Sequence, residues 1–105
     1  MLKTLMEFRK GILFVRLYGT LSFDTINIFK KEVKDTIINM GIKYVVLNIN
    51  NLDSISKDGV LEIKKLEKII NKLEGNFFII GGDIKELKTL VNLENELKVF
   101  ERVVI

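Results

Sequence analysis

The 105-residue sequence contains no cysteine and no histidine. Without cysteine, a disulfide framework, a thiolate zinc site and thiol catalysis are excluded. Without histidine, the chain lacks the commonest general base and the commonest transition-metal ligand. No GxSxG elbow and no SxxK motif is present either. We therefore expect a protein that is not an enzyme and that needs no metal and no other cofactor.

Long apolar stretches are also missing. No run approaches the roughly 20 residues that a membrane-spanning helix needs. Lys3, Glu7 and Arg9 interrupt the amino-terminal segment before the apolar core of a signal peptide can form. We expect a cytoplasmic protein that does not interact with a membrane.

The charge is of both signs and is spread along the chain. Lys and Arg number 17 against 14 Asp and Glu, a formal net charge of +3. Proteins that neutralise phosphates usually concentrate basic residues on one face, whereas here acidic residues interleave them. The pattern indicates a solvated surface and predicts no nucleic-acid partner.

Hydrophobic periodicity predicts a single α/β domain over residues 1–105 in the order β-β-α-β-α-β-α-β. Strands are expected at 2–8, 12–18, 43–49, 76–80 and within 97–105. Ser22 or Asp24 would cap the first helix and Gly41 would end it. Gly75 would end the second helix, and a short third helix would follow Gly81. The predicted helical stripes are Ile26, Phe29, Val33, Ile37 and Met40, then Val60, Ile63, Leu66, Ile70 and Leu73. Right-handed crossovers would make the later strands parallel, and the initial hairpin would make the sheet mixed.

The polar stretch NINNLDSISKDGVLEI, residues 48–63, carries the chemistry between a strand and a helix. Calcium is excluded, because an EF-hand loop with Gly59 at its sixth place would put Lys65 where a bidentate glutamate is required. Ser56 can cap the helix by accepting from an amide of its first turn. A phosphate or nucleotide held by Lys57 and the helix start is a weaker alternative.

Three segments carry a family resemblance: FRKGILFVRLYGTLSFDT, IKYVVLNINNLDSISKDGV and LVNLENELKVF. The second is the most specific, since Leu52, Ile55 and Gly59 match the pattern L-x-x-φ-D-S-[ST]-G without a gap. Together the segments resemble the STAS domain, most closely the bacterial anti-sigma factor antagonists. The resemblance implies a STAS-like mixed β-sheet with helices packed mainly on one face. In that family an unphosphorylated antagonist binds an anti-sigma factor that is also a serine kinase, and the kinase phosphorylates the first serine of the motif.

The sequence departs from the family pattern at the phosphorylated serine. Aligned on Gly59, Ser56 occupies the aspartate position, Lys57 the phosphoacceptor position and Asp58 the second serine. Because lysine cannot take that phosphate, we expect a regulatory protein that binds an anti-sigma factor or a related serine kinase without the standard phosphoserine switch. Ser54 and Ser56 are the alternative phosphorylation sites. The expected partner-binding residues, which include an exposed helix start, are Ser54, Ser56, Lys57, Asp58, Gly59, Leu61 and Glu62.

A second function of a different class stays open. A STAS scaffold or ligand-sensing module could act by self-association, because the edges of a mixed sheet can pair with a second copy.

Overall fold

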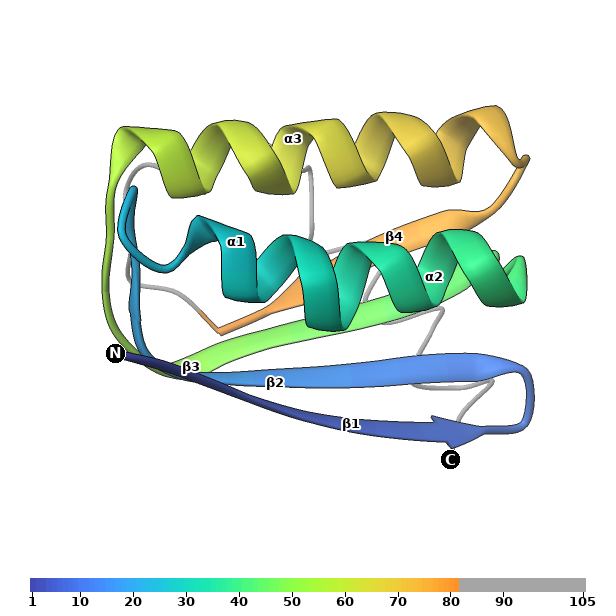
Figure 1. Cartoon of the computed structure of the whole chain (residues 1–105). Helices are drawn as coiled ribbons and strands as arrows, with labels where there is room; N and C mark the ends of the chain where they lie inside the picture. Colours follow the sequence, from blue (N-terminus) through green and yellow to red (C-terminus); the bar gives the residue numbers. More distant parts are fainter. Residues whose placement is uncertain (82–105) are drawn as a thin grey trace.

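In the computed structural model, which describes residues 1–81, a four-stranded mixed sheet carries the helices on one face (Figure 1). The strand order is β1-β2-β3-β4, with β1 antiparallel to β2 and the other two pairs parallel. The elements are β1 (Leu2–Arg9), β2 (Ile12–Leu21), α1 (Ile26–Phe29), η1 (Lys30–Lys34), α2 (Asp35–Met40), β3 (Tyr44–Ile55), α3 (Lys57–Lys72) and β4 (Asn76–Ile80). The predicted mixed sheet and its element order are confirmed up to β4. The third helix and the final strand of the prediction lie outside the described residues.

The first two strands form a tight hairpin. Arg9 pairs with Ile12, which leaves a two-residue turn of Lys10 and Gly11 with φ of 52° and 82°. Positive φ at both positions is typical of a type I′ turn, whose twist matches that of the strands it joins. The expected hairpin between the first two strands is confirmed.

The third strand is longer than predicted. Residues 50–55, expected to form a turn, continue β3 and pair with the end of β2. Two register shifts, between Arg16 and Tyr18 and between Gly19 and Thr20, separate this terminal pairing from the regular ladder. The partner strand supplies hydrogen bonds to a segment whose Asn, Asp and Ser residues would otherwise favour a turn.

The main core lies between the sheet and the helices. Phe29, Val33 and Ile37 face the strands from the first helical segment, and Ile63, Leu66 and Ile70 do so from α3. The predicted stripes are confirmed at these positions. The predictions of Met40 and Leu73 as the last stripe residues are wrong, since these residues are 65% and 37% exposed.

The first helical segment differs from the prediction at its start and in its middle. Its N-cap is Thr25, not Ser22 or Asp24. The Thr25 hydroxyl accepts from the amide of Ser22 at 2.9 Å and donates to the carbonyl of Thr20 at 2.8 Å, which fixes the turn between β2 and α1. The helix then widens into the π-helical turn η1 before α2 resumes the α-helical pattern. Nothing in the apolar spacing indicates such a widening.

The helix ends follow the prediction at one glycine and not at the other. Gly41 caps α2 in the left-handed conformation, with φ of 62°. In contrast, α3 ends at Lys72, and the left-handed residue after it is Glu74 rather than Gly75. Gly75 serves a close approach instead, because an added Cβ would lie 1.9 Å from the carbonyl oxygen of Lys43.

Candidate docking surface at the carboxyl ends of β2 and β3

The end of β2 and the start of α3 are held together by backbone and side-chain contacts. The amide of Ser56 donates to the carbonyl of Leu21 at 2.9 Å. The hydroxyl of Ser54 donates to Thr20 Oγ1 at 3.2 Å. Gly59 fits beneath them, because an added Cβ would meet both Leu21 and Ile55 at 2.9 Å. The segment before α1 and the segment before α3 therefore form one surface at the carboxyl ends of the parallel strands (Figure 1).

The capping role of Ser56 is confirmed. Its side-chain oxygen accepts from the amide of Gly59, the third residue of α3, at 3.3 Å. An N-cap of this kind satisfies one of the amides that the first helical turn leaves unpaired. Ser56 is half-buried, so its hydroxyl is engaged with its own helix.

The predicted binding residues divide into exposed and buried groups. Ser54, Lys57, Asp58 and Leu61 are exposed, and Leu61 leaves 46% of its surface to solvent. Gly59 is buried. The structure thus brings four of the predicted residues together at the surface and keeps Gly59 below them.

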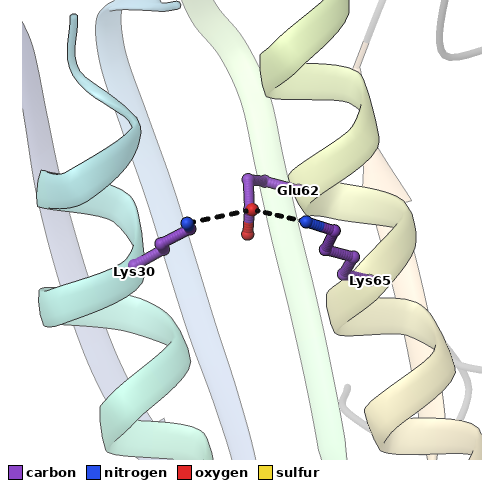
Figure 2. A network of polar contacts seen from close by, with 3 residues as sticks. All are labelled: Lys30, Glu62 and Lys65. Atoms are coloured by element: carbon purple, nitrogen blue, oxygen red, sulfur yellow. Dashed lines mark hydrogen bonds and ion pairs between the residues drawn. The ribbon is translucent and has the colours of Figure 1, made fainter. Parts of the chain in front are cut away.

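Glu62, expected on an exposed helix start, is buried, with 3% of its surface exposed. Its Oε1 pairs with Lys30 Nζ at 3.4 Å and with Lys65 Nζ at 3.3 Å (Figure 2). Its Oε2 is also buried and has no hydrogen-bond partner within residues 1–81. The position follows from helical spacing, because Glu62 lies four residues before Leu66 and on the same side of the helix. Glu62 therefore joins η1 to α3 rather than facing a partner.

Phe23 belongs to this region and is absent from the predicted set. It lies in the turn between Ser22 and Thr25, and 76% of its surface is exposed. The sequence held a signal for it, since Phe23 stands between two polar residues and off the stripe of the following helix. We define the candidate docking surface as Phe23, Ser54, Lys57, Asp58 and Leu61.

The described part of the chain offers little for metal chemistry or for membrane insertion. Within residues 1–81 there is no group of three His, Cys, Asp or Glu side chains that could hold a metal ion. No helix in the same range has the length and apolar character to cross a bilayer. The chemistry available at the docking surface is that of a hydroxyl, an ammonium, a carboxylate and two apolar side chains.

The arrangement of sheet, helices and loop surface is that of a known class of domain. The family model described as the STAS domain matches residues 3–104, so the chain belongs to the STAS domain family. The Anti-sigma F factor antagonist of Paenibacillus polymyxa is 28% identical over 74 residues. That match covers 70% of this chain and 63% of the relative, so the chain spans less than two thirds of the relative's length.

Solved structures show the same fold. The anti-sigma factor antagonist SpoIIAA in its unphosphorylated form gives a TM-score of 0.73 at 13% identity, covering 96% of this chain and 97% of that one. Its phosphorylated form gives 0.74 at 14% identity, with 96% and 99% covered. A putative anti-sigma factor antagonist of Thermotoga maritima gives 0.74 at 20% identity, with 95% and 81% covered. At these identities the likeness shows the fold alone, and the expected STAS-like fold is confirmed.

Proposed function

We propose that this STAS domain is a non-enzymatic regulatory protein of the anti-sigma factor antagonist type. It docks on an anti-sigma factor or a related serine kinase through the candidate docking surface, without a phosphoserine switch at Lys57. The observation that carries the proposal is an exposed surface with apolar and charged side chains at the end of β2 and the start of α3. Phe23 and Leu61 are exposed there by 76% and 46%, and Lys57 and Asp58 at the start of α3 are exposed as well.

The composition of the surface suits a protein partner. Aromatic side chains that become fully buried supply much of the energy of protein interfaces. Charged side chains at the rim contribute to the association rate and to the choice of partner. Phe23 is the expected anchor, and Lys57 and Asp58 are the expected determinants of specificity. Gly59 and Glu62, both buried, shape the surface from below.

The charge of Lys57 supports a role outside folding. Lys57 is the first residue of α3, at the end of the helix where the macrodipole favours negative charge. A cation there opposes helix stability, and residues that break a local rule are expected at functional sites. A phosphoserine would add about −1.5 to −2 charges at the position that lysine occupies.

A binding experiment with charge-reversed variants tests the docking proposal. The partner is the purified anti-sigma factor of the native host, and the readout is the dissociation constant. Lys57→Glu should weaken binding roughly tenfold while the unfolding midpoint stays equal or rises, because glutamate suits a helix start. The matched control is Lys43→Glu, an exposed lysine before β3 at the other end of the sheet. Equal affinity of wild type and Lys57→Glu, with Phe23→Ala also unchanged, would place the interface elsewhere.

A second experiment tests the absence of the switch. The chain is incubated with the partner kinase and ATP, and its intact mass is measured. Wild type should gain no phosphate, whereas Lys57→Ser should gain one because it restores an acceptor hydroxyl. Phosphate on Ser54 or Ser56 of the wild type would show that the switch has moved to another residue.

Self-association is a second candidate, favoured by the edge strand β1. Its side chains Leu5, Met6 and Phe8 are 47%, 40% and 53% exposed, and its outer edge lies at one end of the strand order. Exposed apolar edge strands favour pairing with another chain. Light scattering over a concentration series should show a dimer for wild type and a monomer for Phe8→Lys. A monomeric wild type at every concentration would dispose of this candidate.

A further inference from the structure

A cleft of about 350 Å³ lies on the face of the sheet opposite the helices. We call this the far face. Val46 lies at the floor of the cleft with 1% of its surface exposed, and Leu5, Phe14 and Ile80 are its apolar walls. The volume falls at the lower end of the roughly 300–1,000 Å³ typical of small-molecule sites, which combine apolar walls with a few polar groups.

One group of charges at the cleft is already satisfied. Glu7 pairs with Arg9, Oε1 to Nε at 3.1 Å. The guanidinium of Arg9 in turn lies 4.7 Å from the centre of the Phe14 ring, in a cation–π contact. Glu7 therefore already has a cationic partner on its own strand, in an exposed pair that solvent screens.

A second group presents donors without acceptors. Arg16 lines the cleft, is exposed, and pairs with no carboxylate of residues 1–81. Asn48 lies opposite Arg16 in the β2–β3 register, and its Oδ1 accepts from the amide of Asn50 at 2.9 Å. Because that contact occupies the oxygen, the amide NH₂ of Asn48 is left as a donor beside the guanidinium. A guanidinium and an amide donor on neighbouring strands suit a carboxylate head group.

We propose that this cleft binds a small amphiphilic monoanion, a medium-chain carboxylate. The carboxylate would accept from Arg16 and Asn48, and the alkyl chain would cover the apolar walls of Leu5, Phe14 and Ile80. Because Arg16 is a single cation without a carboxylate partner in residues 1–81, we expect a ligand with a single negative charge. The site is separate from the docking surface, which lies at the carboxyl ends of β2 and β3, so this proposal stands or falls independently of the proposed function.

Titration calorimetry of the full chain with octanoate tests the proposal, with 1-octanol as the neutral ligand of equal chain length. Octanoate should bind and produce amide chemical-shift changes at far-face residues of β2 and β3. Arg16→Gln should weaken octanoate binding roughly tenfold or more, because it removes a charge-assisted hydrogen bond to the carboxylate. The matched control is Lys31→Gln, an exposed lysine of η1 on the helix side. Binding of 1-octanol should be weak and the same in all three proteins.

A blocking variant keeps the test independent of charge. Leu5→Trp places a larger side chain in the cleft at an exposed edge-strand position that tolerates aromatic residues. It should abolish octanoate binding while the unfolding midpoint stays near that of wild type. Three results would each overturn the proposal: no binding of octanoate to wild type, equal affinity in Arg16→Gln, or shift changes confined to the helix side.

Discussion

The two faces of the sheet are built by the same four strands but carry different side chains. The helix-covered face holds the main core, in which Leu17, Phe29 and Leu66 have no exposed surface. The far face holds a small buried cluster of Ile12, Val46 and Phe78, bordered by charged residues such as Arg16. Alternation along each strand makes this division possible, since neighbouring residues point to opposite faces. Stability is therefore concentrated on one face, and the other is freer to carry polar groups for binding.

The largest expected effect on stability comes from truncating a buried side chain in the helix-covered core. Phe29→Ala should lower the free energy of unfolding by about 3–5 kcal/mol, because it leaves a cavity at a fully buried site. Phe14→Ala, at a half-buried position of the far face, should cost less than half as much. Urea unfolding followed by circular dichroism measures both. Equal losses would mean that the two faces contribute alike to stability.

A smaller effect is expected at the start of α3. Ser56→Ala removes the side chain that caps the helix and should cost about 1 kcal/mol. Ser54→Ala is the matched control, since its exposed hydroxyl bonds only to Thr20 Oγ1 among the described residues and should cost less. Thermal unfolding of the two variants separates the cap from the exposed serine. If Ser54→Ala were the more damaging change, the Thr20 contact would matter more for the fold than the cap.

The smallest effect concerns the charged residue within the apolar face. Glu62→Met replaces a buried carboxylate, one oxygen of which lacks a hydrogen-bond partner in residues 1–81, with an apolar side chain of similar length. Its two lysine partners are 42% and 62% exposed, so solvent weakens both ion pairs. We expect stability to stay equal or to rise by up to about 1 kcal/mol. A loss larger than this, measured by urea unfolding, would show that the pairing of Lys30 with Glu62 is needed to hold η1 against α3.

Much of the fold could be predicted because its elements obey local rules. The strand at 76–80 is found with the predicted bounds, and the hairpin turn follows from Gly11. The stripe from Val60 to Ile70 shows which side of α3 faces the sheet. Each of these features is fixed by periodicity or by the conformational freedom of one residue.

Other features depend on contacts that a local pattern does not contain. The extension of β3 to Ile55 comes from pairing with β2 across two register shifts. The N-cap at Thr25 depends on the carbonyl of Thr20, which the turn brings within 2.8 Å. At the candidate site, the exposure of Phe23 and the burial of Glu62 were both missed. Both could have been found from the sequence: helical spacing places Glu62 on the apolar side of α3, and Phe23 stands between two polar residues, off the stripe of the following helix.

The register shifts between β2 and β3 have a mechanical consequence. Irregular pairing of this kind bends a strand and increases its twist. The shifts fall between Arg16 and Thr20, so the regular ladder that carries Phe14 and Val46 ends before the pairs that carry Ser54 and Ile55 begin. Across each shift β3 contains one residue more than β2, so we expect the end of the strand pair to be bent relative to the regular ladder. The turn at Phe23 and the first turn of α3 both follow this end of the strand pair.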